Sequence, residues 1–221
     1  MIVGDITDPA VLDGACTGVE AVVHLAGIAG EARWEDIHSA NVDGTYQVIE
    51  AARRAGVGRI VYASSNHAAG FTPRPASGEL PSDTPLRPDT LYGVSKAFGE
   101  ALGRYYFDRY GLRVACLRIG HCAVEPINDR PAHAAWLSPG DMARLVDACL
   151  RSSVLTYAIV WGVSANTGRW WSLNEAERLG YHPVDDAGPA PDPAPDHHSN
   201  DLVGRLFTTA EYGIDEVRAR S

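Results

Sequence analysis

Short apolar runs alternate with longer helical patterns along most of this chain, and that alternation limits what it can fold into. The apolar runs have the length of strands and lie near Met1–Val3, Glu20–Ala26, Arg59–Ala63, Leu112–Ile119 and Thr156–Trp161. The helical patterns lie near Trp34–Ala55, Thr90–Tyr110 and Pro139–Arg151. Strands joined by helices through short connections form a parallel sheet. The pattern therefore predicts an α/β fold with a doubly wound parallel sheet.

Composition excludes several classes of protein. The 221 residues are 45% hydrophobic and 21% charged, as in an ordinary globular domain with a sizeable core. A formal net charge of -9 argues against nucleic-acid binding, which requires a basic face. The four cysteines are widely spaced, so we expect reduced thiols and neither disulfides nor a metal site. We recognise no signal peptide or membrane span and expect a cytoplasmic protein.

Tyr92 and Lys96 are the most informative pair of polar residues. Their spacing of four places both on one face of a helix. A nearby ammonium favours the phenolate form of tyrosine and lowers its pKa, so Tyr92 could act as a general base. The spacing alone also suits an ordinary amphipathic helix. However, the upstream segment Arg59–His67 is an apolar strand that ends in hydroxyl, amide and imidazole groups, which favours a site at the mouth of a parallel sheet.

These segments resemble the extended short-chain dehydrogenases/reductases, the NAD-dependent epimerase/dehydratase family. The resemblance rests on Ser65, Tyr92 and Lys96, with the strand before Ser65 and the segment Asn41–Thr45. More specifically, the chain resembles the uronate dehydrogenases of that family in Ala63–His67, Pro88–Lys96, Val160–Asn166, Trp170–Trp171 and Leu179–Pro183. The resemblance implies a Rossmann-type sheet. Residues 1–185 are then expected to form a partial NAD-binding domain with substrate-binding elements, and residues 186–221 a Pro-rich strap and tail.

The expected departure from the family lies at the front of the chain. A dinucleotide-binding domain opens with a strand, a Gly-rich turn and a helix whose N-terminus holds the pyrophosphate. No such turn precedes the first strand–helix unit here, and Met1–Asp8 resembles the family's third strand with its following loop. We therefore expect the first strand–helix–strand to be missing. We also expect these 221 residues alone to bind NAD weakly or not at all and to tend to aggregate.

The resemblance implies specific catalytic and cofactor roles. Tyr92 is the expected base, Lys96 holds the nicotinamide ribose, and Ser65 orients the reacting oxygen. Asp5 with Ile6 resembles an adenine clamp, although a strand-ending turn would also favour Asp. Gly27 is expected beside the cofactor, although a tight turn would need the same glycine. The expected cofactor-binding residues are Asp5, Ile6, Leu25, Ala26, Gly27, Asn41, Ser64, Tyr92, Lys96 and Ile119, and the preference for NAD over NADP rests on the resemblance.

The same resemblance predicts how a sugar acid is bound. Arg130 is expected to clamp the carboxylate bidentately, although a lone arginine in a loop is more often solvated. Asn66 and His67, like Ser65, are expected to form hydrogen bonds with sugar hydroxyls. Ala29 and His121 stand where the family pattern predicts serine hydroxyls, so His121 is expected to face the substrate and alter sugar specificity.

The function implied is NAD-dependent oxidation of galacturonate or glucuronate at C1 to the aldarolactone. No His, Asp or Glu cluster suggests a metal. The alternatives are a nucleotide-sugar epimerase or dehydratase, and a truncated, catalytically silent remnant. The resemblance also implies a homodimer or higher homo-oligomer that pairs the Trp34–Ala55 and Thr90–Tyr110 helices.

Overall fold

Four parallel strands form the central sheet of the protein. The computed structural model describes residues 1–126, 133–190 and 202–213. The strands are β1 (Ala21–His24), β2 (Arg59–Ser65), β3 (Arg113–Ile119) and β6 (Tyr157–Gly162), in the order β1-β2-β3-β6. All neighbours run parallel, in register Ala21 with Arg59, Arg59 with Arg113, and Val114 with Tyr157. The predicted α/β parallel sheet is therefore confirmed.

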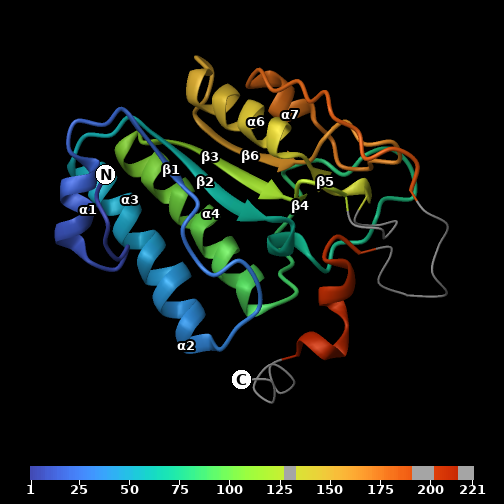
Figure 1. Ribbon diagram of the computed structural model, residues 1–221, viewed down its shortest axis with the longest axis horizontal. Coiled ribbons are helices and arrows are strands. Elements are labelled where there is room, and N and C mark those ends of the chain that lie inside the picture. Colours follow the sequence, from blue (N-terminus) through green and yellow to red (C-terminus); the bar gives the residue numbers. More distant parts are fainter. Residues whose placement is uncertain (127–132, 191–201, 214–221) are drawn as a thin grey trace.

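Helices cover both faces of this sheet (Figure 1). One face carries α1 (Pro9–Cys16), the α2–α3 helix and α4 (Leu91–Tyr110); the other carries α6 (Pro139–Arg151) and α7 (Asn174–Arg178). The α2–α3 helix starts as α2 (Trp34–Ile37), passes through a π-helical stretch, His38–Asp43, and continues as α3 (Gly44–Arg54). Such π-helical stretches are frequent at functional sites, and this one carries Asn41.

Caps set the helix ends that the sequence predicts. The Thr90 hydroxyl accepts a hydrogen bond from the Gly93 amide (2.9 Å) and starts α4, which ends where Gly111 adopts a φ of 70°. The Ser138 hydroxyl accepts from the Asp141 amide (2.8 Å) and starts α6. These two helices match the predicted ranges because hydroxyl caps and a terminal glycine are local signals.

Each face of the sheet has its own buried core. On one face Ile49, Ile60 and Cys116 are fully buried among the side chains of α1, α3 and α4. On the other, Leu145 and Trp161 are fully buried beneath α6 and α7. Burial of a large apolar side chain contributes about 1.5–3 kcal/mol, so both layers hold the sheet rigid behind its carboxyl edge.

A buried ion pair joins α4 to β3. Arg118 donates two hydrogen bonds, each of 2.9 Å, to the carboxylate of Glu100, and both side chains are almost fully buried. Glu100 also accepts from the Ser64 hydroxyl at 2.6 Å. Arg118 donates further to the carbonyls of Ser82 and Thr84. The pair is therefore satisfied on every side and fixes the end of β2, where the polar cluster begins.

The prediction of a strand at Met1–Val3 was wrong. Residues 1–5 have no regular secondary structure, and Met1, Ile2 and Val3 are exposed. A strand is stabilised by its neighbours, and β1 pairs only with β2 in the part of the chain that is described. Helix α1, which follows Asp8 as its N-cap, was not predicted. Among the described residues, no helix is long and apolar enough to cross a membrane.

Four short elements complete the carboxyl edge of the sheet. Strands β4 (His121–Cys122) and β5 (Trp136–Leu137) form a small parallel pair, and a 3₁₀ turn, η2 (Asn66–Ala69), follows β2. A further 3₁₀ turn, η4 (Arg205–Thr208), lies in the C-terminal segment, residues 202–213. None of these was predicted, because two to four residues carry too little pattern.

Candidate active site

A cavity of about 440 Å³ opens at the carboxyl ends of β1, β2 and β3. Its volume lies within the range of ordinary small-molecule sites, and its position is where open parallel sheets bind ligands. It is lined by Leu25, Gly27, Ile28, Ala29, Gly30, Ala63, Ser64, Ser65, His67, Tyr92, Lys96, Ile119, Gly120, His121, Cys122, Arg205 and Phe207.

Tyr92 enters the cavity from the first turn of α4. The amides of Leu91 and Tyr92 donate to the carboxylate of Glu31 at 3.2 and 2.8 Å, an acidic cap that suits a helix N-terminus. Tyr92 is 8% exposed, and burial raises the pKa of its phenol. A hydrogen bond with the Ser65 hydroxyl acts in the opposite direction and favours the phenolate. Ser65 and Tyr92 therefore lie within contact in the same cavity.

Lys96 lies one turn further along α4. Its ammonium donates to the carbonyl of Ala63 at 2.8 Å, and lies 5.5 Å from the centre of the Tyr92 ring and 5.3 Å from that of Tyr62. Burial lowers the pKa of Lys96 to about 8. The expectation that Lys96 lowers the pKa of Tyr92 is not met in this arrangement, because burial raises that pKa and the ammonium is directed to a backbone carbonyl.

The loop after β1 forms the opposite wall. Gly27 has a φ of 141°, and a Cβ there would lie 2.7 Å from the Asn41 side-chain oxygen. That oxygen accepts from the Ile28 amide at 2.7 Å, while the Asn41 amide donates to the Ile28 carbonyl and the Ser95 hydroxyl, both at 3.0 Å. Asn41 therefore ties the loop to α4 and keeps the bare backbone of Gly27 beside the cavity.

His67 and Asp89 form a buried pair beside Tyr92. The Nδ1 of His67 lies 2.9 Å from a carboxylate oxygen of Asp89, whose side chain is fully buried. The His67 ring lies 5.8 Å from the Tyr92 ring, centre to centre. Because the carboxylate is an acceptor, neutral His67 carries its proton on Nδ1 and presents Nε2 to the cavity as an acceptor. His67 can therefore accept a hydrogen bond from a hydroxyl group through Nε2.

The C-terminal segment closes the cavity on the side of His67. The Asn66 amide donates to the Val203 carbonyl at 3.0 Å, and the Phe207 ring lies 4.4 Å from the His67 ring. A Cβ on Gly204 would lie 1.7 Å from an Asp89 oxygen, so only glycine permits this approach. The sequence analysis did not identify Arg205 and Phe207 as residues that line the cavity. The one signal in the sequence was a group of apolar residues after the Pro-rich stretch, which indicates that this segment packs against the domain.

Most of the predicted site residues meet at the cavity. Those that line it are Leu25, Gly27, Ser64, Ser65, His67, Tyr92, Lys96, Ile119 and His121. Asp5, Ile6, Ala26, Asn41 and Asn66 do not line it. Asp5 accepts from the amide and hydroxyl of Thr7 instead, and the Asn66 amide is turned to Val203. Arg130 lies outside the described residues.

Among the described residues, no three His, Cys, Asp or Glu side chains gather closely enough to hold a metal ion. Burial lowers the pKa of His121, and the charge of Arg205 lowers it further. His121 is thus favoured in its neutral form.

Residues 1–153 match the model of the NAD dependent epimerase/dehydratase family. The chain belongs to this family. It is 44% identical over 183 residues to a uronate dehydrogenase of Agrobacterium fabrum. The aligned residues make up 83% of this chain and 68% of that relative. It is 40% identical over 199 residues to an NAD-dependent glucose-6-phosphate dehydrogenase of Haloferax volcanii, covering 84% of this chain and 76% of the relative. The predicted family is confirmed, and these relatives are dehydrogenases.

A solved structure supports the same family and fold. A mutant of uronate dehydrogenase from Agrobacterium tumefaciens, complexed with NAD, superimposes with a TM-score of 0.85 at 39% identity. The match covers 96% of this chain and 81% of that protein. The Rossmann-type fold is therefore confirmed, and the family to which the chain belongs is one of NAD-dependent enzymes.

Proposed function

We propose that this protein oxidises a hexuronic acid, galacturonate or glucuronate, at C1 with NAD as the oxidant and the aldarolactone as product. The observation that supports this most is the convergence of Ser65, Tyr92 and Lys96 on one cavity in a chain 44% identical to a uronate dehydrogenase. A cyclic sugar acid needs one base, one hydride acceptor and one anchor for its carboxylate, and the cavity supplies the first.

The residues that line the cavity fit the nicotinamide end of NAD. Gly27 presents backbone without a side chain, and Leu25 and Ile119 add apolar surface beside it. Lys96 would hold the nicotinamide ribose. When bound, NAD supplies the acceptor for the hydride that leaves C1.

Tyr92 and Ser65 then act on the C1 hydroxyl. The Tyr92 phenolate takes the hydroxyl proton while the C1–H bond breaks and its electron pair leaves as hydride, so that C1 becomes the lactone carbonyl. Ser65 donates to the reacting oxygen and orients it. His67 accepts from a sugar hydroxyl through Nε2, in the orientation that Asp89 imposes. Arg130 remains the predicted carboxylate clamp.

NADH formation tests the proposal directly. Galacturonate and glucuronate should each reduce NAD, with the aldarolactone as the first product seen by NMR. Sugar interconversion without net NADH would favour the alternative, a nucleotide-sugar epimerase or dehydratase. Inertness toward every sugar would favour the catalytically silent remnant.

A homodimer is proposed through the helices on the α3 and α4 side. Several large side chains there are exposed, among them Tyr46 on α3 and Val94, Tyr105 and Tyr110 on α4. Exposed aromatic clusters of this kind are enriched at protein interfaces. Sedimentation should show a dimer that Tyr105→Glu dissociates, and an unchanged mass for that variant would contradict the pairing.

A further inference from the structure

Arg205 has a backbone conformation that side chains rarely adopt. Its φ is 53°, and it is the one non-glycine residue in the described ranges 1–126, 133–190 and 202–213 with a positive φ. The left-handed region is unfavourable for a residue with a Cβ, and such residues persist where the surrounding structure imposes them, often at ligand sites. The position would suit glycine better, so the presence of arginine calls for a reason.

The surrounding contacts hold Arg205 in place. The Val203 and Gly204 amides donate to the carbonyls of Thr72 (2.9 Å) and Gly70 (2.8 Å). On the other side of Arg205, the Phe207 ring packs 4.4 Å from the ring of His67. Fixed on both sides, the segment leaves Arg205 little freedom, and its side chain is brought to a defined wall of the cavity.

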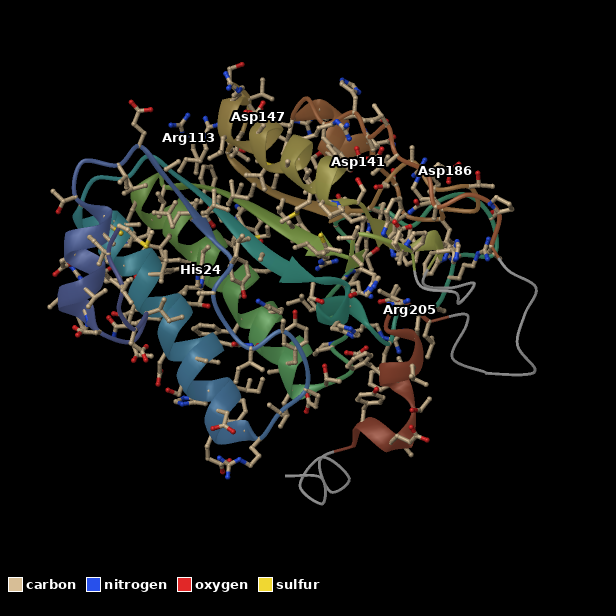
Figure 2. All side chains as sticks on the ribbon, viewed as in Figure 1. His24, Arg113, Asp141, Asp147, Asp186 and Arg205 are labelled. Atoms are coloured by element: carbon tan, nitrogen blue, oxygen red, sulfur yellow. The ribbon has the colours of Figure 1, made fainter. Side chains whose placement is uncertain are left out.

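That wall faces the reacting groups. Arg205 lines the same cavity as Tyr92, Lys96 and His121, and its charge acts on His121. Figure 2 shows Arg205 where the C-terminal segment meets the carboxyl ends of the strands. Lys96 and Arg205 carry the only charged side chains among the described residues that line the cavity. The described lining of the cavity is therefore cationic, and the Lys96 ammonium donates to the Ala63 carbonyl.

We propose that Arg205 is a specificity-determining residue that supplies a guanidinium, in addition to the predicted clamp Arg130, to the anionic group of the sugar at the end of the ring away from C1. A guanidinium matches a carboxylate or a phosphate ester in the same planar, bidentate way. The inference rests on the proposed function for the identity of the reaction, but the contact itself requires only an anionic pyranose in this cavity. This role would explain why arginine stands at a position whose backbone conformation suits glycine.

Arg205→Gly is the decisive variant, because glycine adopts this φ freely while the guanidinium is removed. We expect kcat/KM for galacturonate to fall about 10- to 100-fold, mainly through KM, as for the loss of a charge-assisted hydrogen bond. Activity on galactose, a neutral sugar with the same ring, should change less than about 2-fold. Arg205→Lys should be intermediate on galacturonate. Glucose 6-phosphate, measured in parallel, distinguishes a carboxylate from a phosphate as the favoured anion.

The controls separate binding from folding. Leu206→Ala changes the exposed neighbour of Arg205 and should leave both kinetics and Tm unchanged, while Arg205→Gly should not lower Tm. Equal losses on galacturonate and galactose, or no loss on either, would overturn the proposal for Arg205 while leaving the proposed reaction intact. If the wild-type protein reduces no NAD with any sugar, the proposed function fails. Calorimetric titration with galacturonate and glucose 6-phosphate then decides Arg205, because equal affinities in wild type and Arg205→Gly would overturn it.

Discussion

The phenol of Tyr92 is buried, which disfavours loss of its proton, whereas its proposed role as the base requires the phenolate. Replacing it with phenylalanine keeps the ring and its contacts with His67 but removes the base. We expect Tyr92→Phe to lower kcat more than about 10²-fold, with little change in KM, as for deletion of a general base. Steady-state kinetics on galacturonate would measure both. Turnover close to that of the wild type would show that another group takes the proton.

The buried Lys96 should lower the free energy of unfolding of the protein at neutral pH. Its folded pKa of about 8 lies below the ordinary 10.5, so below pH 8 the fold holds a buried ammonium that is better solvated when unfolded. The difference corresponds to about 3 kcal/mol, partly offset by its hydrogen bond to the Ala63 carbonyl. Lys96→Met should therefore raise the free energy of unfolding by about 1–3 kcal/mol at pH 7 while abolishing activity.

The difference in free energy of unfolding between the wild type and Lys96→Met should depend on pH. Between pH 8 and 10.5 the folded protein has already released the Lys96 proton, whereas the unfolded chain still binds it. Stability of the wild type relative to Lys96→Met should therefore rise with pH across this window. Urea unfolding at pH 7, 8.5 and 10 would measure it. A difference that stays constant with pH would mean that Lys96 is solvated in the folded state.

At the scale of elements, the buried pair of Glu100 on α4 and Arg118 on β3 should be the most sensitive link between helix and sheet. Glu100→Ala leaves the Arg118 guanidinium buried without its carboxylate, which costs about 3–5 kcal/mol in comparable cases. Asp108→Ala is the matched control, because its pair with Arg104 is about half exposed and is expected to contribute less than about 1 kcal/mol. Thermal unfolding of both variants would test this, and similar losses would contradict it.

The elements predicted correctly are those whose signals are local. Helix α6 begins at Pro139 after a serine cap and ends at Arg151, as its apolar period predicts. Met1–Val3 has an equally strand-like sequence, but strand formation depends on a partner supplied from elsewhere, which a local pattern cannot reveal. The same holds for the site. Ser65, Tyr92 and Lys96 follow from one strand and one helix, whereas Arg205 reaches the cavity through contacts that no pattern encodes.

At the scale of the whole molecule, β1 is one of the two edge strands of the central sheet, with β6 at the other side. In the described structure β1 pairs with β2 alone, so its other side presents unpaired backbone groups. Apolar side chains add to this surface, because Val23 and Leu25 are 39% and 58% exposed and Ile2 is 58% exposed. An exposed apolar edge strand is a template for pairing with another chain. The 221-residue chain is therefore expected to self-associate through β1 as its concentration rises.

Val23→Lys tests this edge, because a charge on an edge strand opposes strand pairing without removing a buried contact. Light scattering should show that the wild-type chain forms large species as its concentration increases and that Val23→Lys suppresses them. Val94→Lys, on the exposed side of α4, is the matched control: it adds the same charge at a site of similar exposure, 42% against 39%. It should affect only a dimer formed through the helices. Equal suppression by both variants would show that net charge, and not the β1 edge, governs the association.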